Sequence, residues 1–205
     1  MSQDLGQRLF SFGIITDTHL NQGEDDCNSP FEVNSLANRR MRHVVRDLNA
    51  RDLAFVVHVG DLVHPVPAIP NLYAEAAARF HEQMVDLKHP LYLTPGNHDV
   101  GDKPNDWAPA ACVHEDHLAL WDHHFGAQYQ TFDHDDCHFI IINAQIINSG
   151  FTAEAAQRDW LEKDLEANKG KRIFLHSHYP PCVSRPDEEE NYDNIGEPGR
   201  PWVLK

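Results

Sequence analysis

The sequence has no apolar run long enough to cross a membrane, and its N-terminus lacks the basic and then apolar segment that starts a secretory signal. We therefore expect a cytoplasmic protein without membrane attachment. Cysteine is also scarce, and no two cysteines form a Cys-x-x-Cys pair. This spacing predicts reduced thiols and argues against a zinc knuckle or a disulfide framework. The four cysteines are Cys27, Cys112, Cys137 and Cys182.

Positive charge is in short supply as well. Lys and Arg number 17 against 32 Asp and Glu, which gives a formal net charge of −15. Such a field repels phosphate backbones and disfavours nucleic acids and anionic membrane surfaces as partners. It does not exclude a small phosphorylated substrate, because bound cations reverse the sign of a pocket. Histidine, in contrast, is abundant, and several of the 15 histidines lie beside Asp or Asn at chain turns.

Apolar runs alternate with segments whose apolar residues recur every three or four positions, a pattern typical of α/β proteins. The length suits one sizeable core, so we expect a single domain over residues 1–205. Segments 101–111 and 180–201 are predicted to be loops, with the acidic run 187–190 exposed to solvent. We predict strands at 9–15, 53–59, 91–94, 138–142 and 172–175, and helices at 33–48, 73–87 and 114–125. A further helix is predicted from a Thr152 cap to near Gly170.

Polar side chains follow four of the predicted strands at the point where each strand ends. Ligands bind at the carboxyl ends of the strands in open α/β sheets, so we expect these four turns to meet at one crevice. Each turn alone is a common pattern, whereas the ordered set of four is hard to reach by chance. The turns are Thr16-Asp17-Thr18-His19, Gly60-Asp61, Pro95-Gly96-Asn97-His98-Asp99 and His176-Ser177-His178-Tyr179-Pro180-Pro181.

The side chains in these turns form a coherent set of metal ligands. Carboxylate, imidazole and amide oxygen, without cysteine, suit divalent ions such as Mn, Fe or Zn. Asp61 is placed to bridge two ions, since a carboxylate has two oxygens. Gly60 and Gly96 leave room for the backbone to approach the metals. Two such ions bind a phosphoryl oxygen, generate hydroxide and stabilise an in-line displacement.

The same ordered residues resemble the calcineurin-like metallophosphoesterase superfamily, over residues 9 to about 181. The class III cyclic-nucleotide phosphodiesterases and their relatives look most similar, with a hairpin at 125–141 and a helix at 157–165. The resemblance implies a four-layer α-β-β-α sandwich, in which two mixed sheets are flanked by helices. It also implies hydrolysis of a phosphomonoester or phosphodiester, including a cyclic nucleotide, by metal-bound hydroxide at a dinuclear metal centre.

Matched to the family pattern, Asp17 and His19 would bind the first metal and Asp61 would bridge the two. Asn97 and a later histidine would bind the second metal. The family's usual His-x-Pro selects His178 for that role, with His176 as the alternative. The resemblance makes His98 the general acid, and Asp99 the residue that orients it and keeps it charged.

The family's closing Gly-His-x-His motif is absent from the sequence. In the family this motif gives each metal one more histidine, so we expect a domain truncated at its C-terminus. Two alternative functions stay open. A metal-dependent nuclease is disfavoured by the charge of −15. A non-catalytic scaffold that kept the fold would have no need of an imidazole at position 98. The sequence specifies neither the ester, the metal nor the oligomeric state.

The other histidines favour structural or solvent-exposed roles. His58 interrupts an apolar strand and is predicted to be a core histidine with a backbone partner. His64 follows Gly60-Asp61 closely, but a contact with substrate is the less favoured interpretation. We expect solvent exposure for the histidines on the predicted helix 114–125 and on the hairpin, which are His114, His117, His123, His124, His134 and His138.

Overall fold

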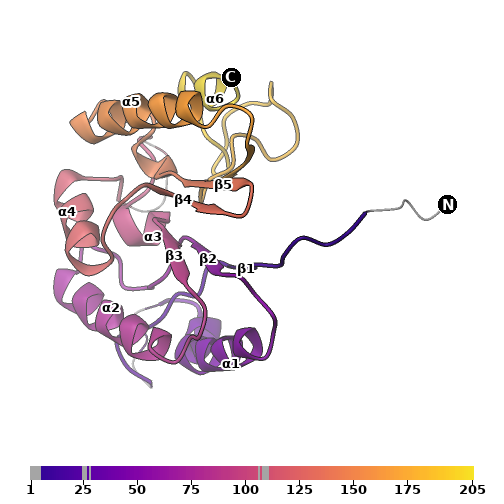
Figure 1. The fold of residues 1–205 in the computed structure, drawn as a ribbon. Helices are drawn as coiled ribbons and strands as arrows, with labels where there is room; N and C mark the ends of the chain where they lie inside the picture. The colour runs from indigo at the N-terminus through magenta and orange to yellow at the C-terminus, as the bar shows by residue number, and fades with distance from the viewer. Residues whose placement is uncertain (1–5, 25–26, 28, 106, 108–110) are drawn as a thin grey trace.

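The computed structural model describes residues 6–24, 27, 29–105, 107 and 111–205. It contains two three-stranded sheets that lie between two groups of helices (Figure 1). The first sheet is parallel throughout, in the order β1 (Gly13–Ile15), β2 (Val56–Val59), β3 (Leu91–Thr94). In the second sheet β4 (Gln130–His134) is antiparallel to β5 (Cys137–Ile141), which is parallel to β6 (Arg172–His176).

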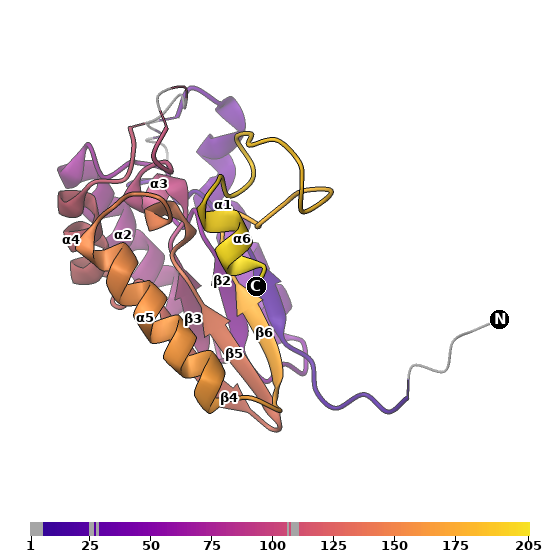
Figure 2. The same ribbon diagram turned by 90° about the horizontal axis from the view of Figure 1, so that it is seen from above.

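Helices cover the outer face of each sheet. A 3₁₀ turn, η1 (Glu32–Leu36), leads into α1 (Ala37–Asn49), and α1 and α2 (Pro70–Met84) cover the first sheet. The second sheet carries α5 (Thr152–Ala167) and α6 (Gly199–Val203), as the view from above shows (Figure 2). Three further elements complete the set: α3 (Asn97–Val100), α4 (Glu115–His124), which packs in the same core as α2, and η2 (Ala144–Ile146). The four-layer α-β-β-α architecture is therefore confirmed, although among the described strands only the second sheet is mixed.

The alternation of side chains along the central strands explains the layers. Val57 of β2 and Phe139 of β5 point between the sheets and belong to one buried cluster with neighbouring aromatic rings. The next residue of β5, Ile140, points the other way and packs with Leu161 of α5. Successive residues of a strand face opposite sides, so strands buried on both faces become continuous apolar runs. The continuous apolar runs in the sequence could therefore be recognised as strands.

The observed strands differ from the predicted ones mainly at their beginnings. β3 coincides with the predicted strand 91–94, whereas β1 and β2 begin three or four residues later than expected. Phe10 and Phe12 are apolar because they pack against the inter-sheet cluster, not because they are paired in the sheet. The hairpin implied by the family resemblance is confirmed as β4 and β5. Burial and strand pairing are separate properties, and the sequence pattern reports the first.

Some expectations about helices and loops need correction. The N-cap of α5 is Phe151, not Thr152, and the Glu154 carboxylate accepts hydrogen bonds from the N–H groups of Asn148 and Gly150. The last three residues of the predicted loop, 199–201, instead belong to α6. The predicted loop 101–111 includes residues 106 and 108–110, which lie outside the described residues. All four cysteines are free thiols. Among the described residues, no helix combines the length and apolar character of a membrane span.

Candidate metal centre

The turns that follow β1 and β2 have unusual backbone conformations. Asp17, His19 and Asp61 have φ values of 53°, 46° and 57°, in the left-handed region. Residues other than glycine are uncommon there, and such strain is concentrated at functional sites. The two turns hold each other in place, since Asp17 N–H donates to Gly60 C=O at 3.0 Å and His19 N–H to Asp61 C=O at 3.1 Å. Two strained segments thus lie side by side with their acidic and imidazole side chains together.

Two glycines permit this close approach. A Cβ atom on Gly60, whose φ is +92°, would lie 2.5 Å from Nδ1 of His178. A Cβ atom on Gly96 would lie 2.2 Å from the carboxylate of Asp61. Real Cβ atoms do not come so close to other atoms, so only glycine allows the strand ends to meet at this distance.

The first group of converging donor atoms belongs to Asp17, His19 and Asp61, whose ligand atoms all lie within 4.8 Å of one another. Nε2 of His19 is 3.9 Å from Oδ1 of Asp17 and 3.6 Å from Oδ2 of Asp61. These separations are too long for hydrogen bonds and leave room for an ion between the atoms. Burial lowers the pKa of His19 even though Asp61 opposes the shift. The imidazole therefore keeps a lone pair available at neutral pH.

The second group uses the other oxygen of Asp61. Nε2 of His178 lies 3.5 Å from Oδ1 of Asp61 and 3.0 Å from Oδ1 of Asn97. Nδ1 of His178 is 2.8 Å from Val59 C=O, which only accepts hydrogen bonds, so the proton of the neutral ring is on Nδ1. Three electron-rich atoms then face one another. A cation between them satisfies all three, so the donor set fits a metal ion.

His98 and Asp99 occupy the single helical turn α3, and the structure corrects the role expected for Asp99. The buried Asp99 carboxylate accepts hydrogen bonds from the backbone N–H groups of Leu62 at 2.9 Å and Gly96 at 2.8 Å. Among the described residues, no hydrogen bond joins it to the His98 imidazole, whose buried Nδ1 has no partner. Asp99 therefore fastens the Gly60-Asp61 turn to the α3 turn instead of orienting His98. Burial, and then the nearby charge of Asp61, raise the pKa of Asp99, while its backbone hydrogen bonds oppose the shift.

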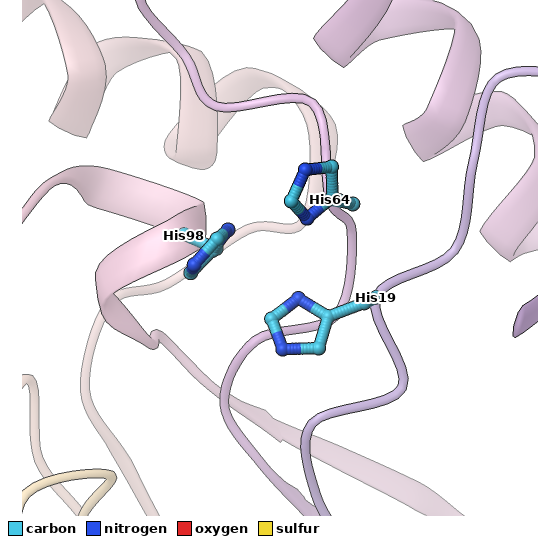
Figure 3. A group of neighbouring side chains, drawn as sticks. All are labelled: His19, His64 and His98. Atoms are coloured by element: carbon cyan, nitrogen blue, oxygen red, sulfur yellow. The ribbon is translucent and has the colours of Figure 1, made fainter. Parts of the chain in front are cut away.

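A histidine that the sequence did not favour joins this region. His64 is 7% exposed, and its ring centroid lies 5.1 Å from that of His98 and 5.7 Å from that of His19 (Figure 3). The imidazoles of His19 and His98 are themselves 4.6 Å apart, almost perpendicular. Three imidazoles from three different turns thus form one cluster. The only sequence signal for His64 was its position three residues after Asp61.

The structure separates the two histidines at the end of β6. His178 reaches Asp61 and Asn97, as described above. The ring of His176 instead lies 6.2 Å from the rings of Phe12 and Phe139 in the aromatic layer between the sheets. Residues two apart on a strand face the same side, but the strand ends at His176, and His178 already belongs to the following turn.

Two further histidines differ from their predicted environments. His58 is in the core, as expected, but its partner is a side chain: Nε2 lies 2.8 Å from Oγ1 of Thr18. Burial, and then the proximity of His178, lower the pKa of His58 to about 3. His138 was expected to be exposed and is instead 3% exposed, with Asp133 and Asp164 at 2.6 and 2.7 Å from its two nitrogens. A polar residue amid an apolar strand is explained here by burial with partners.

The metal-centre residues line a pocket of about 570 Å³. Asn97, His98 and His178 form part of its wall, and the chain beyond β6 contributes Val183 and Tyr192. Among the described lining residues there is no Lys or Arg. The charge of an anionic ligand in this pocket would therefore have to be met by cations bound to the protein.

A family model described as calcineurin-like phosphoesterase matches residues 10–200. The chain belongs to the calcineurin-like phosphoesterase family. Among curated relatives, the serine/threonine-protein phosphatase CPPED1 of Mus musculus is 28% identical over 160 residues, 74% of this chain and 47% of that protein. The Danio rerio protein of the same name is 29% identical over 157 residues, 69% of this chain and 45% of that protein. The chain thus spans about half the length of these relatives.

Solved structures agree on the fold. A dimetal phosphatase from Danio rerio aligns with a TM-score of 0.66 and 12% identity, covering 97% of this chain and 77% of that one. The purple acid phosphatase PPD1 from yellow lupin (Lupinus luteus) seeds aligns with a TM-score of 0.56 and 17% identity, covering 94% of this chain and 34% of that one. At these identities the likeness shows the fold. A fold of this family implies divalent metals in a dinuclear site.

Proposed function

We propose that this calcineurin-like phosphoesterase hydrolyses phosphomonoesters with two divalent cations that bind on opposite sides of Asp61. The observation that carries the proposal is the orientation of the Asp61 carboxylate. Oδ2 faces Nε2 of His19 at 3.6 Å, whereas Oδ1 faces Nε2 of His178 at 3.5 Å. One carboxylate therefore presents one oxygen to each group of donors, as a bridging ligand must.

In this proposal Asp17 and His19 bind one cation, Asn97 and His178 bind the other, and Asp61 is shared. The described residues would thus offer three protein donors to each cation. The absence of sulfur from the donor set favours Mn, Fe or Zn over softer ions. Burial lowers the pKa of His19 and keeps its lone pair available, while His178 directs Nε2 at the site because its Nδ1 faces Val59 C=O.

The cations would offset the charge of the phosphoryl oxygens and make a water molecule more acidic. The chain's own residues supply the rest. The strained turns hold the two donor groups at fixed spacing, and Asp99 anchors these turns through backbone N–H groups. His98 lines the pocket beside them and donates a proton to the leaving oxygen. The pocket wall has no Lys or Arg among its described residues, so recognition of the phosphate depends on the cations.

Phosphomonoesters, including phosphoserine and phosphothreonine side chains, are the substrates proposed here because the matched relatives are named as serine/threonine-protein phosphatases. Phosphodiesters and cyclic nucleotides remain the second candidate, since the same ligands serve both reactions. A single domain over residues 1–205, a cytoplasmic location and the lack of nucleic-acid partners stay predictions. The net charge of −15 favours the last of these.

The test is an assay of the protein with added Mn²⁺ on four substrates: a phosphoserine peptide, an aryl phosphomonoester, an aryl phosphodiester and a cyclic nucleotide. We expect turnover of the two monoesters, abolished by chelator, and much slower turnover of the diester and the cyclic nucleotide. Hydrolysis of the diester or cyclic nucleotide alone would contradict the proposed substrate class. No turnover of any of the four would contradict the enzymatic function.

A variant of His98 tests its role as the acid. General-acid help is worth on the order of 10²–10⁴ in rate, and it matters most for poor leaving groups. His98→Ala should therefore slow the phosphoserine peptide much more than the nitrophenyl monoester, with unchanged Mn²⁺ content. The exposed His123→Ala is the matched control and should behave as wild type on both. An equal loss on the two substrates would show that His98 is not the proton donor.

A further inference from the structure

We propose that Tyr192 is a positioning residue for the metal centre, because its hydroxyl determines which end of the Asn97 carboxamide faces the cations. The inference rests on the proposed function, in which Asn97 binds one of two cations. Tyr192 lies in the segment 182–195, here called the 182–195 loop, which follows β6 and contributes to the pocket wall.

An asparagine ligand has an orientation problem that a carboxylate does not have. The two ends of the carboxamide are similar in size, but only the oxygen has lone pairs for a cation. Oδ1 of Asn97 faces Nε2 of His178 at 3.0 Å, and Nδ2 donates a hydrogen bond to the hydroxyl of Tyr192 at 3.2 Å. Rotation of the amide by half a turn would direct two N–H donors at the metal centre. The hydrogen bond to Tyr192 opposes that rotation.

The tyrosine hydroxyl accepts this bond because its own proton is directed elsewhere. Tyr192 donates to Oδ2 of the fully buried Asp102 at 3.5 Å, and Tyr179 donates to Oδ1 of the same carboxylate at 2.5 Å. A carboxylate accepts and does not donate, so both tyrosine protons point toward Asp102. The Tyr192 oxygen, which also faces the Tyr179 hydroxyl, then keeps a lone pair for Asn97. The chain of donation runs from Asn97 through Tyr192 to Asp102.

The 182–195 loop is held in the position that this contact needs. The buried Lys103, next to Asp102 in the sequence, donates through Nζ to Asn191 C=O at 2.5 Å and also to Asn194 C=O. The side chain of Asn194 is fully buried and donates to the Glu188 carboxylate at 2.7 Å. In the acidic run 187–190 three residues are exposed as expected, but the half-buried Glu188 takes part in fixing the loop. Asp102 and Lys103 together fix both the hydroxyl and the backbone around it.

Mn²⁺ titration calorimetry of Tyr192→Phe tests the proposal. The variant keeps the ring and removes only the oxygen, so Asn97 loses the acceptor that orients it. Loss of a partner that orients a metal ligand typically weakens metal binding about 10- to 100-fold, and we expect an effect of this size on one of the two Mn²⁺ ions. Tyr129→Phe, at a half-buried tyrosine that packs against Trp160, is the matched control and should bind both ions as wild type does.

A double-variant cycle distinguishes orientation from a general structural role. Asn97→Asp offers an oxygen whichever way the group turns, so it removes the need for orientation. In the Asn97→Asp background, Tyr192→Phe should change Mn²⁺ affinity by no more than about twofold, the scale on which independent sites are additive. Asp102→Asn provides a second approach, because the amide it introduces could donate to the Tyr192 hydroxyl and reverse the chain of donation. Asp102→Asn should therefore weaken binding of the same Mn²⁺ ion that Tyr192→Phe affects.

Three results would overturn the proposal. Tyr192→Phe could leave both Mn²⁺ affinities unchanged, or it could weaken binding as much in the Asn97→Asp background as in the otherwise wild-type chain. If Tyr192→Phe does not fold, unchanged Mn²⁺ binding by Asp102→Asn would have the same meaning. A wild-type chain that binds fewer than two Mn²⁺ ions would contradict the proposed function itself. Two ions in wild type with unaffected variants would contradict only the role of Tyr192.

Discussion

Two clusters of histidine and carboxylate lie at opposite ends of the sheets, and they are built differently. At the hairpin, His138 has Asp133 and Asp164 at 2.6 and 2.7 Å from its nitrogens. At the metal centre, the separations between His19 or His178 and the nearest carboxylate oxygens run from 3.5 to 3.9 Å. The first distances are hydrogen bonds, whereas the second leave room for another atom.

The two clusters also differ in backbone conformation and in whether their buried histidine nitrogens have hydrogen-bond partners. His138 lies in a regular strand with both nitrogens paired. His19 lies in the left-handed region, and the buried Nδ1 atoms of His19 and His98 have no hydrogen-bond partner in the part of the chain that the structure describes. Buried polar groups are nearly always paired in folded proteins, and strain is retained where function requires it. We infer that the hairpin cluster is complete without a ligand and the metal centre is not.

Among the variants that test this comparison, Asp61→Asn should have the largest effect, which is a loss of activity at the metal centre. The change removes the charge that both donor groups share while it keeps an oxygen that can accept from His98 N–H, now 2.9 Å away. We expect activity to fall on the order of a hundredfold or more, beyond the usual cost of an outer hydrogen-bond partner. Thermal unfolding in chelator should be unchanged or shifted upward, because the charge of Asp61 also raises the pKa of the buried Asp99.

The matched control is Asp159→Asn, at an exposed position on α5. It should leave both activity and unfolding unchanged. If Asp61→Asn retained full activity, Asp61 would not be the shared ligand. A chelated Asp61→Asn chain that unfolds well below wild type would show that the carboxylate is structural.

Asp99→Asn should have an intermediate effect. It should change the free energy of unfolding and not the catalysed reaction. The amide would set an N–H group against the backbone N–H of Gly96 or Leu62, which now donate to the carboxylate. Leaving a buried donor unsatisfied costs about 1–3 kcal/mol in the free energy of unfolding. Urea denaturation in chelator measures this cost directly. No loss of stability would mean that Asp99 does not fasten the two turns.

The smallest expected effect is a change in stability at the hairpin. There His138→Gln tests the cluster of His138, Asp133 and Asp164, which needs no added ligand. Burial alone would lower the pKa of His138, but the hydrogen bonds to Asp133 and Asp164 outweigh it and raise the pKa. A raised histidine pKa stabilises the fold fully below about pH 6.5. This contribution is lost as pH rises from there through the folded-state pKa. We expect the stability difference between wild type and variant to shrink as pH rises through that range.

Urea denaturation of both proteins at pH 6.0 and pH 8.5 checks this sign. Asp133 also faces Lys171 at 2.8 Å, but this ion pair is present in both proteins, so the difference between them reports on the histidine. Mn²⁺ binding by His138→Gln should equal that of wild type. A stability difference that grows with pH, or a loss of Mn²⁺, would remove the distinction between the two clusters.

The α/β class could be predicted because strands buried on both faces leave continuous apolar runs, whereas the four layers were expected from the family resemblance. Strand beginnings could not be predicted, since Phe10 and Phe12 are apolar for packing without being paired. β4 was expected only from the family resemblance, because its alternating exposure gives no continuous run. Local patterns report burial and period, whereas pairing depends on partners far along the chain.

The convergence of the proposed ligands at one site could be predicted, but the contacts that support them could not. Asp17, His19, Asp61 and Asn97 follow strands, so topology alone brings them together. The anchoring of Asp99 to Leu62, the position of His64 and the contact of Tyr192 with Asn97 depend on turns that pack together from distant parts of the sequence. No local pattern encodes such contacts. The same reason explains why a buried His138 was predicted to be exposed.

The central claim is that Asp61 separates two cation sites. Anomalous diffraction from crystals of this protein soaked in Mn²⁺ tests it most directly. We predict two peaks, one beside Oδ2 of Asp61 with Asp17 and His19, and one beside Oδ1 with Asn97 and His178. We predict no peak at His138, whose nitrogens are already paired. A single peak at the metal centre, or two peaks that do not share Asp61, would contradict the account.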